Sequence, residues 1–153
     1  MRPETLLVLT MAVGVGGLVG VWPAMGGVSP AAVAVDQVQG CRVTDGDTMR
    51  CGRERIRLLG IDAPELPGHC REGRDCAPGD PFASTDSLRS AMASVMTIRR
   101  VGQDRYDRTL ATVSGPKGDL SCWQLARHQA IYKPAWDDGF RVARACPRAV
   151  VAG

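Results

Sequence analysis

Histidine is scarce in this chain, which has only His69 and His128 among its 153 residues, and no two of its six cysteines are spaced as Cys-x-x-Cys. Structural zinc sites are usually built from such cysteine pairs and from histidines. Zinc is therefore a less favoured role for the cysteines than disulfide bonding, which is typical of small domains outside the reducing cytosol. A complete EF-hand loop is also missing, which argues against a calcium site of that kind.

Aromatic residues make up only 5% of the chain, and its three tryptophans form no aromatic stripe. We expect Trp123 to belong to the core. Trp136 stands beside Tyr132 and Lys133, where it is either an ordinary packed side chain or a ring that stacks on a base.

Charged residues are absent from residues 6–21, and this apolar composition continues with Gly and Pro interruptions to the end of segment 1–34. Ala32-Val33-Ala34 is the small-x-small pattern of a signal-peptidase site, so cleavage would leave a domain of residues 35–153. The alternative is a retained membrane anchor formed by residues 6–30. Both interpretations place the domain outside the cytoplasm, as a periplasmic, secreted or membrane-anchored protein.

Around Gly46 the sequence predicts a β-hairpin. The turn Asp45-Gly46-Asp47 separates two strand-like segments, and its length favours a glycine in the left-handed conformation. Cys41 and Cys51 lie symmetrically about Gly46, so they face each other across the two strands. We therefore predict a Cys41–Cys51 disulfide.

The remaining pattern predicts an α+β domain, mainly β, in which Asp80 caps the first helix and Pro81 begins it. The expected strands cover residues 38–44, 48–51, 56–61, 97–101 and 109–114, and the expected helices residues 80–95, 119–128 and 139–145. Residues 66–79 predict an irregular loop rich in Gly and Pro. We expect this loop to be closed by a Cys70–Cys76 disulfide, with Cys122 and Cys146 as the third pair.

Two aspartates are placed to share a cation. Asp47 leaves the hairpin turn and Asp62 ends the third strand, so a meander brings them together, and a backbone carbonyl with water completes an oxygen shell of the kind calcium prefers. Arg57 and Asp62 would face opposite sides of a flat strand, so we expect the strand to break at Gly60. Glu65 follows at a position suited to take a proton from a metal-bound water.

Two arginines are candidate phosphate ligands. Arg57 interrupts an apolar run, where an arginine either extends its charged end to the sheet edge or binds an anion. Arg108 lies on a distant turn, and two guanidinium groups can stabilise the added negative charge of a pentacoordinate phosphorus. Residues 1–34 are neutral overall, so the net charge of +3 belongs to the rest of the chain and mildly favours polyanions.

Three segments, Thr44-Asp45-Gly46-Asp47-Thr48, residues 57–65 (RLLGIDAPE) and residues 104–110 (DRYDRTL), closely resemble the staphylococcal nuclease (thermonuclease) family. The resemblance covers roughly residues 38–132. It implies a five-stranded OB-type β-barrel with about three helices. It also implies calcium-dependent hydrolysis of phosphodiester bonds in DNA and/or RNA, by in-line attack of water, by a monomeric endonuclease.

The charged positions of that family are all filled in this chain. By resemblance, the calcium ligands are Asp47, Asp62 and the backbone carbonyl of Ala63, with Asp45 in the outer shell; Glu65 is the general base; Arg57 and Arg108 bind the scissile phosphate; and Arg105 and Tyr106 bind a terminal phosphate. Asp107 stands where the family has a glycine, and it adds an acid that can pair with Arg108.

Two other functions compete with the nuclease. One is a catalytically inactive OB-type module of the cell envelope that binds nucleic acid or a protein. The other is a disulfide-bridged structural protein whose acids are solvated turn residues.

Overall fold

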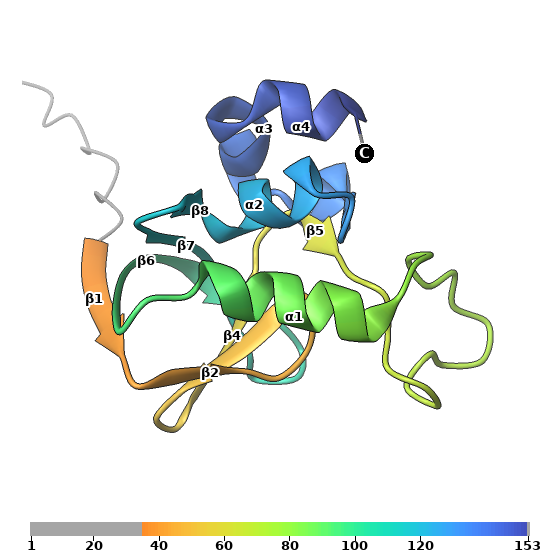
Figure 1. The fold of residues 1–153 in the computed structure, drawn as a ribbon, viewed down its shortest axis with the longest axis horizontal. Helices are drawn as coiled ribbons and strands as arrows, with labels where there is room; N and C mark the ends of the chain where they lie inside the picture. Colours follow the sequence, from red (N-terminus) through yellow and green to blue (C-terminus); the bar gives the residue numbers. More distant parts are fainter. Residues whose placement is uncertain (1–34, 153) are drawn as a thin grey trace, which may run out of the picture. The chain divides into compact units, whose positions relative to one another are not determined.

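The computed structural model describes residues 35–152, so the predicted targeting segment 1–34 lies outside the described residues. The described part has a mixed α/β fold (Figure 1). Its strands are β1 (Val35–Gln39), β2 (Cys41–Val43), β3 (Thr48–Cys51), β4 (Glu54–Leu58), β5 (Ile61–Asp62), β6 (Val95–Gln103), β7 (Thr109–Gly115), β8 (Gly118–Asp119) and β9 (Ile131–Tyr132). Its helices are α1 (Pro81–Ala91), α2 (Leu120–Ala126), α3 (Arg141–Ala145) and α4 (Pro147–Ala152), with 3-10 turns η1 (Pro134–Trp136) and η2 (Asp138–Phe140).

Seven strands form one sheet in the order β1-β6-β7-β4-β3-β2, with β8 paired to β7, while β5 and β9 form a separate pair. The predicted meander is present as β2-β3-β4. The predicted strand 38–44 is divided, because Gly40 adopts a φ of +64° and turns the chain. As a result β1 pairs with β6, whereas β2 pairs with β3. No pairing between the end strands β1 and β2 is seen in residues 35–152, so the expected closed barrel is not observed.

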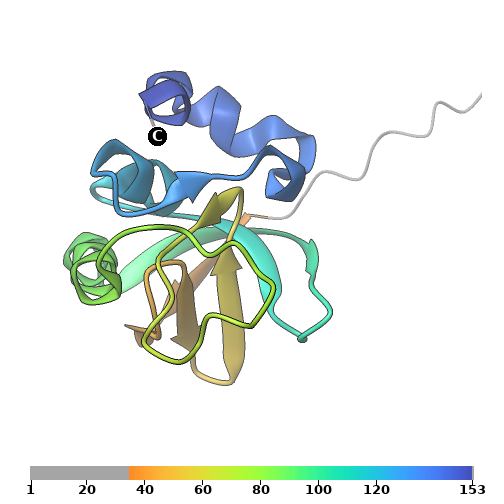
Figure 2. The same ribbon diagram turned by 90° about the vertical axis from the view of Figure 1, so that its right-hand side faces the viewer.

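Helix α1 begins as predicted, since the Asp80 side chain accepts hydrogen bonds from the backbone N–H groups of Phe82 and Ala83. It ends at Ala91 instead of near residue 95, because Val95 is already the first residue of β6 and pairs with Gln39. Figures 1 and 2 show α1 alongside the sheet and the other three helices gathered at one end of it.

The core lies between the sheet and these helices. Strands β6 and β7 alternate buried and more exposed side chains, as expected for strands with one face on a core. The largest fully buried apolar side chains come from strands, helices and the β4–β5 turn alike: Met49, Ile56, Leu58, Leu59, Ile61, Leu88, Met96, Ile98, Val113, Leu120 and Leu125. The strands β3, β4 and β5, which contain or directly adjoin the predicted site residues Asp47, Arg57 and Asp62, are therefore anchored in one continuous apolar cluster.

All three predicted disulfides are confirmed. Cys41 and Cys51 are direct partners in the hairpin register, Cys70 and Cys76 close the loop before α1, and Cys122 on α2 bonds to Cys146. The last bond secures α4, a helix that the sequence pattern did not predict. Three disulfides are consistent with an extracellular or periplasmic location. None of the helices in residues 35–152 is long and apolar enough to cross a membrane.

An ion-pair network ties the sheet together. Arg100 on β6 donates through Nε and Nη2 to both carboxylate oxygens of Glu54 on β4, at 2.7 and 2.8 Å, and through Nη1 to Asp36 on β1 at 2.7 Å. Thr109 also donates to Glu54, at 2.9 Å. These contacts, with the Arg100 hydrogen bonds as the largest cause, lower the pKa of Glu54 below its ordinary value of 4.5.

We predict that Glu54→Gln destabilises the fold near neutral pH and has little effect in acid. Because the folded pKa is lower than the unfolded one, the carboxylate stabilises the fold above its unfolded pKa, and this is lost as the pH falls through the folded pKa. Allowing for solvent screening, we expect a loss of about 1 kcal/mol at about pH 7 that shrinks toward about pH 3. Urea denaturation measures it, with Glu72→Gln as an exposed control. A loss independent of pH would contradict this account.

Candidate active site

The turn Asp45-Gly46-Asp47 packs directly against helix α1. The prediction of a left-handed Gly46 was wrong, since its φ is not positive. Gly46 is needed for a different reason: a Cβ there would lie 2.0 Å from Ser84 Oγ and 2.7 Å from Ala63 Cβ. Gln124, which is fully buried, donates to the Gly46 carbonyl at 2.7 Å. This close approach holds the aspartates on either side of Gly46 against the core.

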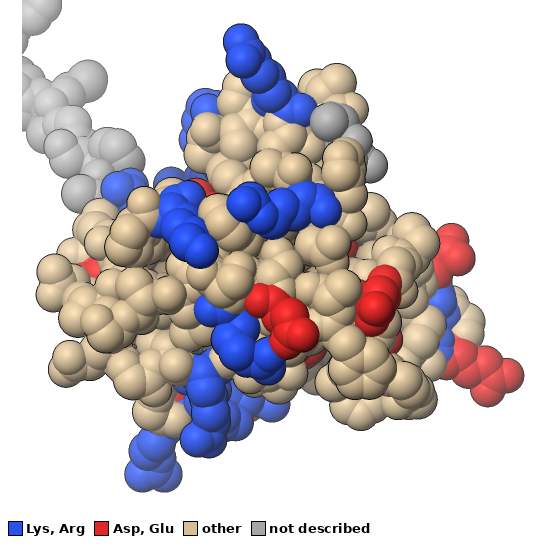
Figure 3. All heavy atoms as spheres, viewed as in Figure 1, with Lys and Arg blue, Asp and Glu red and all other residues tan. Residues whose placement is uncertain are grey.

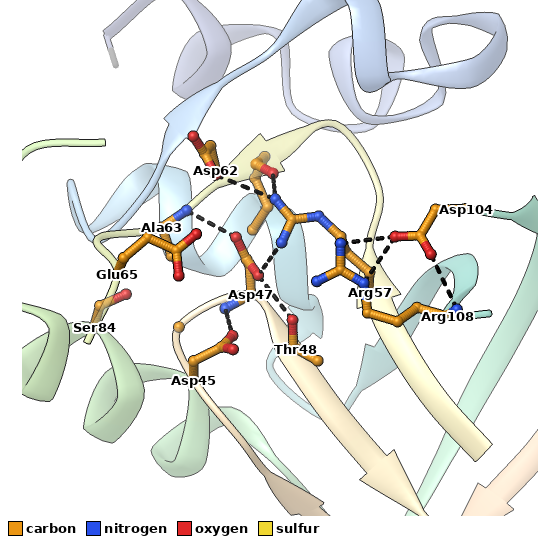
Figure 4. A network of polar contacts seen from close by, with 12 residues as sticks. Asp45, Asp47, Thr48, Arg57, Asp62, Ala63, Glu65, Ser84, Asp104 and Arg108 are labelled. Carbon is orange, nitrogen blue, oxygen red and sulfur yellow. Dashed lines mark hydrogen bonds and ion pairs between the residues drawn. The ribbon is translucent and has the colours of Figure 1, made fainter. Parts of the chain in front are cut away.

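At the centre of the site, one buried guanidinium joins two buried carboxylates (Figure 4). Arg57 Nη1 donates to Asp47 Oδ1 at 2.5 Å, and Arg57 Nη2 donates to Asp62 Oδ1 at 3.2 Å. Asp47 accepts two further hydrogen bonds at 2.9 Å, from the Thr48 hydroxyl and the Ala63 backbone N–H. Arg57 is only 8% exposed and Asp62 only 1%. The predicted metal ligands and a predicted phosphate ligand thus form one network.

The break in the strand at Gly60 allows the residues of this network to meet. Strand β4 ends at Leu58, Gly60 adopts a φ of +72°, and the chain continues as β5, which pairs with β9 in the second sheet. Because the chain turns between the two sheets, Arg57 and Asp62 meet although a flat strand would direct them to opposite faces. The expected break at this glycine is confirmed.

Glu65 lies beyond Pro64 with its side chain about one-fifth exposed, at 21%. It accepts a hydrogen bond from Arg74 Nη1 at 2.6 Å, and Arg74 Nη2 donates to Asp62 Oδ1 at 2.7 Å. Burial alone would lower the pKa of the Arg74 guanidinium, because it disfavours the charged form. The negative charges and hydrogen bonds of Asp62 and then Glu65 outweigh this effect, so the pKa of Arg74 is raised. The predicted general base is therefore linked to Asp62 through an arginine.

Arg108 is directed toward Asp104 and not toward its neighbour Asp107. Arg108 Nε donates to Asp104 Oδ2 at 2.8 Å, Arg108 Nη2 lies 2.7 Å from the same oxygen in an ion pair, and the Arg108 backbone N–H donates to Asp104 Oδ1. No ion pair between Arg108 and Asp107, the alternative that the sequence allowed, is found in the described residues, and Asp107 adopts a φ of +56°. Asp107 thus takes the left-handed conformation for which glycine is best suited.

Tyr106 is surrounded by arginines. The guanidinium carbons of Arg71, Arg105 and Arg108 lie 5.0, 4.9 and 5.4 Å from the centre of its ring. Arg71 also donates to the Tyr106 hydroxyl at 2.7 Å. Desolvation opposes ionisation of this hydroxyl, but the arginines, first Arg105 and then Arg71, lower the pKa of Tyr106. The cluster is a concentrated positive surface of the kind that binds phosphate.

One open cavity of about 1060 Å³ connects these groups. It is lined by the three residues predicted to be catalytic, Arg57, Glu65 and Arg108, and by the predicted substrate ligands Arg105 and Tyr106. The predicted outer-shell acid, Asp45, also lines it. The predicted metal ligands Asp47 and Asp62 do not line the cavity but bond to Arg57, which does, and the backbone N–H of Ala63 donates to Asp47. All predicted site residues therefore meet at one place.

Two features of the acids bear on cation binding. Burial, followed by the charge of Asp47, raises the pKa of Asp45 to about 6. Asp62 Oδ2 is buried and has no hydrogen-bond partner within residues 35–152, which is unusual for a buried carboxylate oxygen. No group of three or more His, Cys, Asp or Glu side chains is arranged as a metal cluster in the described part of the chain.

Sequence reasoning missed Arg71, Arg74 and Asp104. The two arginines lie in the loop closed by Cys70 and Cys76, and the sequence pattern gave no function for this loop. The only sequence signal for them was their position between two cysteines that were predicted to bond. Asp104 lies in segment 104–110, which resembles the nuclease family, but its pairing with Arg108 depends on the conformation of the turn. Trp136 also belongs to the cavity wall, 41% exposed, with the Arg57 guanidinium 5.1 Å from its ring centre.

Comparison of the sequence with models of known protein families finds no match, and comparison with curated proteins finds none either.

We predict that Gly46→Ala destabilises the protein by about 1–3 kcal/mol, because the new methyl group would overlap the buried Ser84 side chain. Urea denaturation measures the loss. Gly102→Ala is the matched control, since no atom lies within 4 Å of a Cβ at that position. Equal stability of the two variants would show that the close approach of the turn to α1 is unimportant.

We predict that Arg57→Leu costs about 3–5 kcal/mol in the presence of chelator, because two buried carboxylates lose their shared counter-charge. The control is Arg53→Leu in the exposed β3–β4 turn, which should change stability by less than about 0.5 kcal/mol. Chemical denaturation of both variants tests the prediction. A small effect at Arg57 would mean that the ion pairs are replaced by water.

Proposed function

We propose that the protein is an exported, calcium-dependent nuclease that hydrolyses phosphodiester bonds in DNA and/or RNA. The observation that carries the proposal is the buried Asp47–Arg57–Asp62 network, opening into a cavity that Glu65 and Arg108 also line. A structural protein has little reason to bury an arginine between two acids beside a cavity, since burying charges carries a large desolvation cost.

The charge distribution supports an anionic substrate. The cavity wall has six arginines against five acids. The arginines are Arg55, Arg57, Arg71, Arg74, Arg105 and Arg108, and the acids are Asp45, Glu65, Asp104, Asp137 and Asp138. The face in Figure 3 carries basic and acidic side chains, some of them side by side near its centre, among wide uncharged areas. Arginine presents five N–H donors in a planar fork and binds phosphate through two of them at once.

The residues present fit a calcium ion. Asp47 and Asp62 with the Ala63 carbonyl would hold it, with Asp45 in the outer shell. The buried oxygen Asp62 Oδ2 accepts no hydrogen bond within residues 35–152, which leaves it available as a ligand atom. These are the oxygen ligands that calcium prefers, and water and substrate supply the remaining ones. When bound, the ion polarises the scissile phosphate and favours ionisation of a nearby water.

The protein's own residues then have separate roles. Arg57 and Arg108 bind non-bridging phosphate oxygens and stabilise the charge that grows on them during the reaction. Glu65 accepts the proton of the attacking water. A new P–O bond forms from the water oxygen on the side opposite the 5′ oxygen while the P–O5′ bond breaks. The leaving 5′ oxygen takes a proton from solvent water, so the products carry a 5′-hydroxyl and a 3′-phosphate. Arg105 and Tyr106 hold a neighbouring phosphate.

The scaffold proposed for this chemistry is an OB-type barrel of the staphylococcal nuclease kind. The meander β2-β3-β4, the parallel β4–β7 pair and helix α1 alongside the sheet support this proposal. Export of the domain is supported by three disulfides and by the predicted targeting segment. The binding-module alternative shares this scaffold and the arginine–aromatic clusters, and differs only in lacking cleavage.

We predict that the purified protein shortens a labelled oligonucleotide in calcium and leaves it intact in chelator. Glu65→Gln should lower the cleavage rate by about 10²-fold or more, because the proton acceptor is lost. Arg108→Ala should lower it by about 10²–10³-fold. Gel analysis of the products, with end-group determination, measures both effects.

Two matched controls separate these effects from a general change of charge. Glu72→Gln and Arg53→Ala alter exposed residues that do not line the cavity, so both should cleave at the parent rate. Retention of intact oligonucleotide in calcium, with an affinity that falls with salt, would favour the binding module. Equal cleavage rates of the parent protein and Glu65→Gln would refute the role of Glu65 as proton acceptor.

A further inference from the structure

Arg74 occupies a position that the nuclease proposal leaves unexplained. It belongs to the loop between β5 and α1, which projects from the side of the sheet and is closed by the Cys70–Cys76 disulfide (Figure 1). Its guanidinium nevertheless reaches back and binds one oxygen of Asp62 and one of Glu65, at 2.7 and 2.6 Å. These acids are the proposed cation ligand and the proposed base.

The contact is not explained by packing of the loop. Most of residues 68–75 are exposed, and the Arg74 side chain is itself 33% exposed. Asp62 Oδ1 already accepts a hydrogen bond from Arg57, so Arg74 is a second guanidinium on the same oxygen. What the contact achieves is charge balance, because Asp47, Asp62 and Glu65 carry three negative charges against the single positive charge of Arg57.

A divalent cation bound by Asp62 competes with this arrangement. The ion and the Arg74 guanidinium would share one carboxylate, and like charges at that separation repel each other. Arg74 must therefore loosen its hold on Asp62 as the ion binds. A substrate phosphate bound by Arg57 and Arg108 would be a partner for the released guanidinium, because Arg74 lines the same cavity as these two arginines.

We propose that Arg74 is a third substrate-binding arginine, which neutralises Asp62 and Glu65 in the free protein and moves to a substrate phosphate when calcium binds. This inference rests on the proposed nuclease function. Its consequence is positive coupling: calcium frees the ligand that the substrate needs, and the substrate removes the competitor that opposes calcium.

The disulfide and Trp136 keep the released side chain inside the cavity. Cys70 and Cys76 close a short loop around Arg74, so its backbone has little freedom to move away. The Arg74 guanidinium carbon already lies 6.0 Å from the Trp136 ring centre, and Arg57 lies 5.1 Å from the same ring. The aromatic wall therefore provides a surface along which the guanidinium can shift toward a phosphate bound at Arg57.

Calcium titration by calorimetry, without substrate, tests the first half of the inference. Arg74→Gln should bind calcium about 10-fold more tightly than the parent full chain, because two charge-assisted hydrogen bonds no longer oppose the ion. Arg74→Lys should fall between them. Arg71→Gln is the matched control. It removes the same charge from the same loop, but the Arg71 side chain bonds to Tyr106 and makes no ion pair with Asp62 or Glu65, so the affinity should change less than about twofold.

Steady-state cleavage of a labelled oligonucleotide at saturating calcium tests the second half. Arg74→Gln should raise KM by about 10-fold through loss of a phosphate contact, and Arg74→Lys by less. An arginine that only anchors the loop would lower the melting temperature and leave KM and calcium affinity unchanged, which would overturn the inference. Equal calcium affinity of the parent and Arg74→Gln, with cleavage intact, would overturn it while the nuclease function stands. If no protein in the set binds calcium or cleaves, both proposals are wrong.

Discussion

The rest of this structure depends on burying the Arg57 guanidinium between the carboxylates of Asp47 and Asp62. A buried charge is tolerated only when it is paired and hydrogen-bonded. The pairing requires that the hairpin turn, the end of β4 and the start of β5 converge on one point. The turn at Gly60 and the close packing of Gly46 against α1 are the local features that satisfy this requirement.

The same principle extends outward from the centre. The three residues assigned to the chemical step each have an oppositely charged internal partner: Arg57 with two aspartates, Glu65 with Arg74, and Arg108 with Asp104. The free protein thus holds its site in a self-neutralised form. A cation and an anionic substrate entering together can exchange these internal pairs for external ones with little net change in charge balance, which suits a site that takes both.

Several elements could be predicted because their signals are local. The hairpin register predicted that Cys41 faces Cys51, and Asp80-Pro81 predicted the beginning of α1. Arg57 and Asp62 are five residues apart and would face opposite sides of a flat strand, which predicted the break at Gly60. Other features escaped because distant partners decide them. Predicted strand 38–44 divides at Gly40, because its two parts pair with different strands, β6 and β3. Helix α1 ends early because Val95 belongs to β6. Helix α4 follows Cys146, which the disulfide bond joins to Cys122 on α2. The expected barrel closure is not seen in the pairing of the described strands.

The sequence by itself indicated the hairpin acids, Arg57, Asp62, Glu65 and Arg108 of the candidate site and the Cys41–Cys51 pair, since spacing along a meander and a hairpin is a local property. Only the tertiary structure decided which charge pairs with which. Arg74 reaches Asp62 from a loop 12 residues away, and Arg108 binds Asp104 instead of Asp107. The reason is physical: side-chain pairing depends on distances in space, and these are set by how the two sheets, α1 and the disulfide loop pack together.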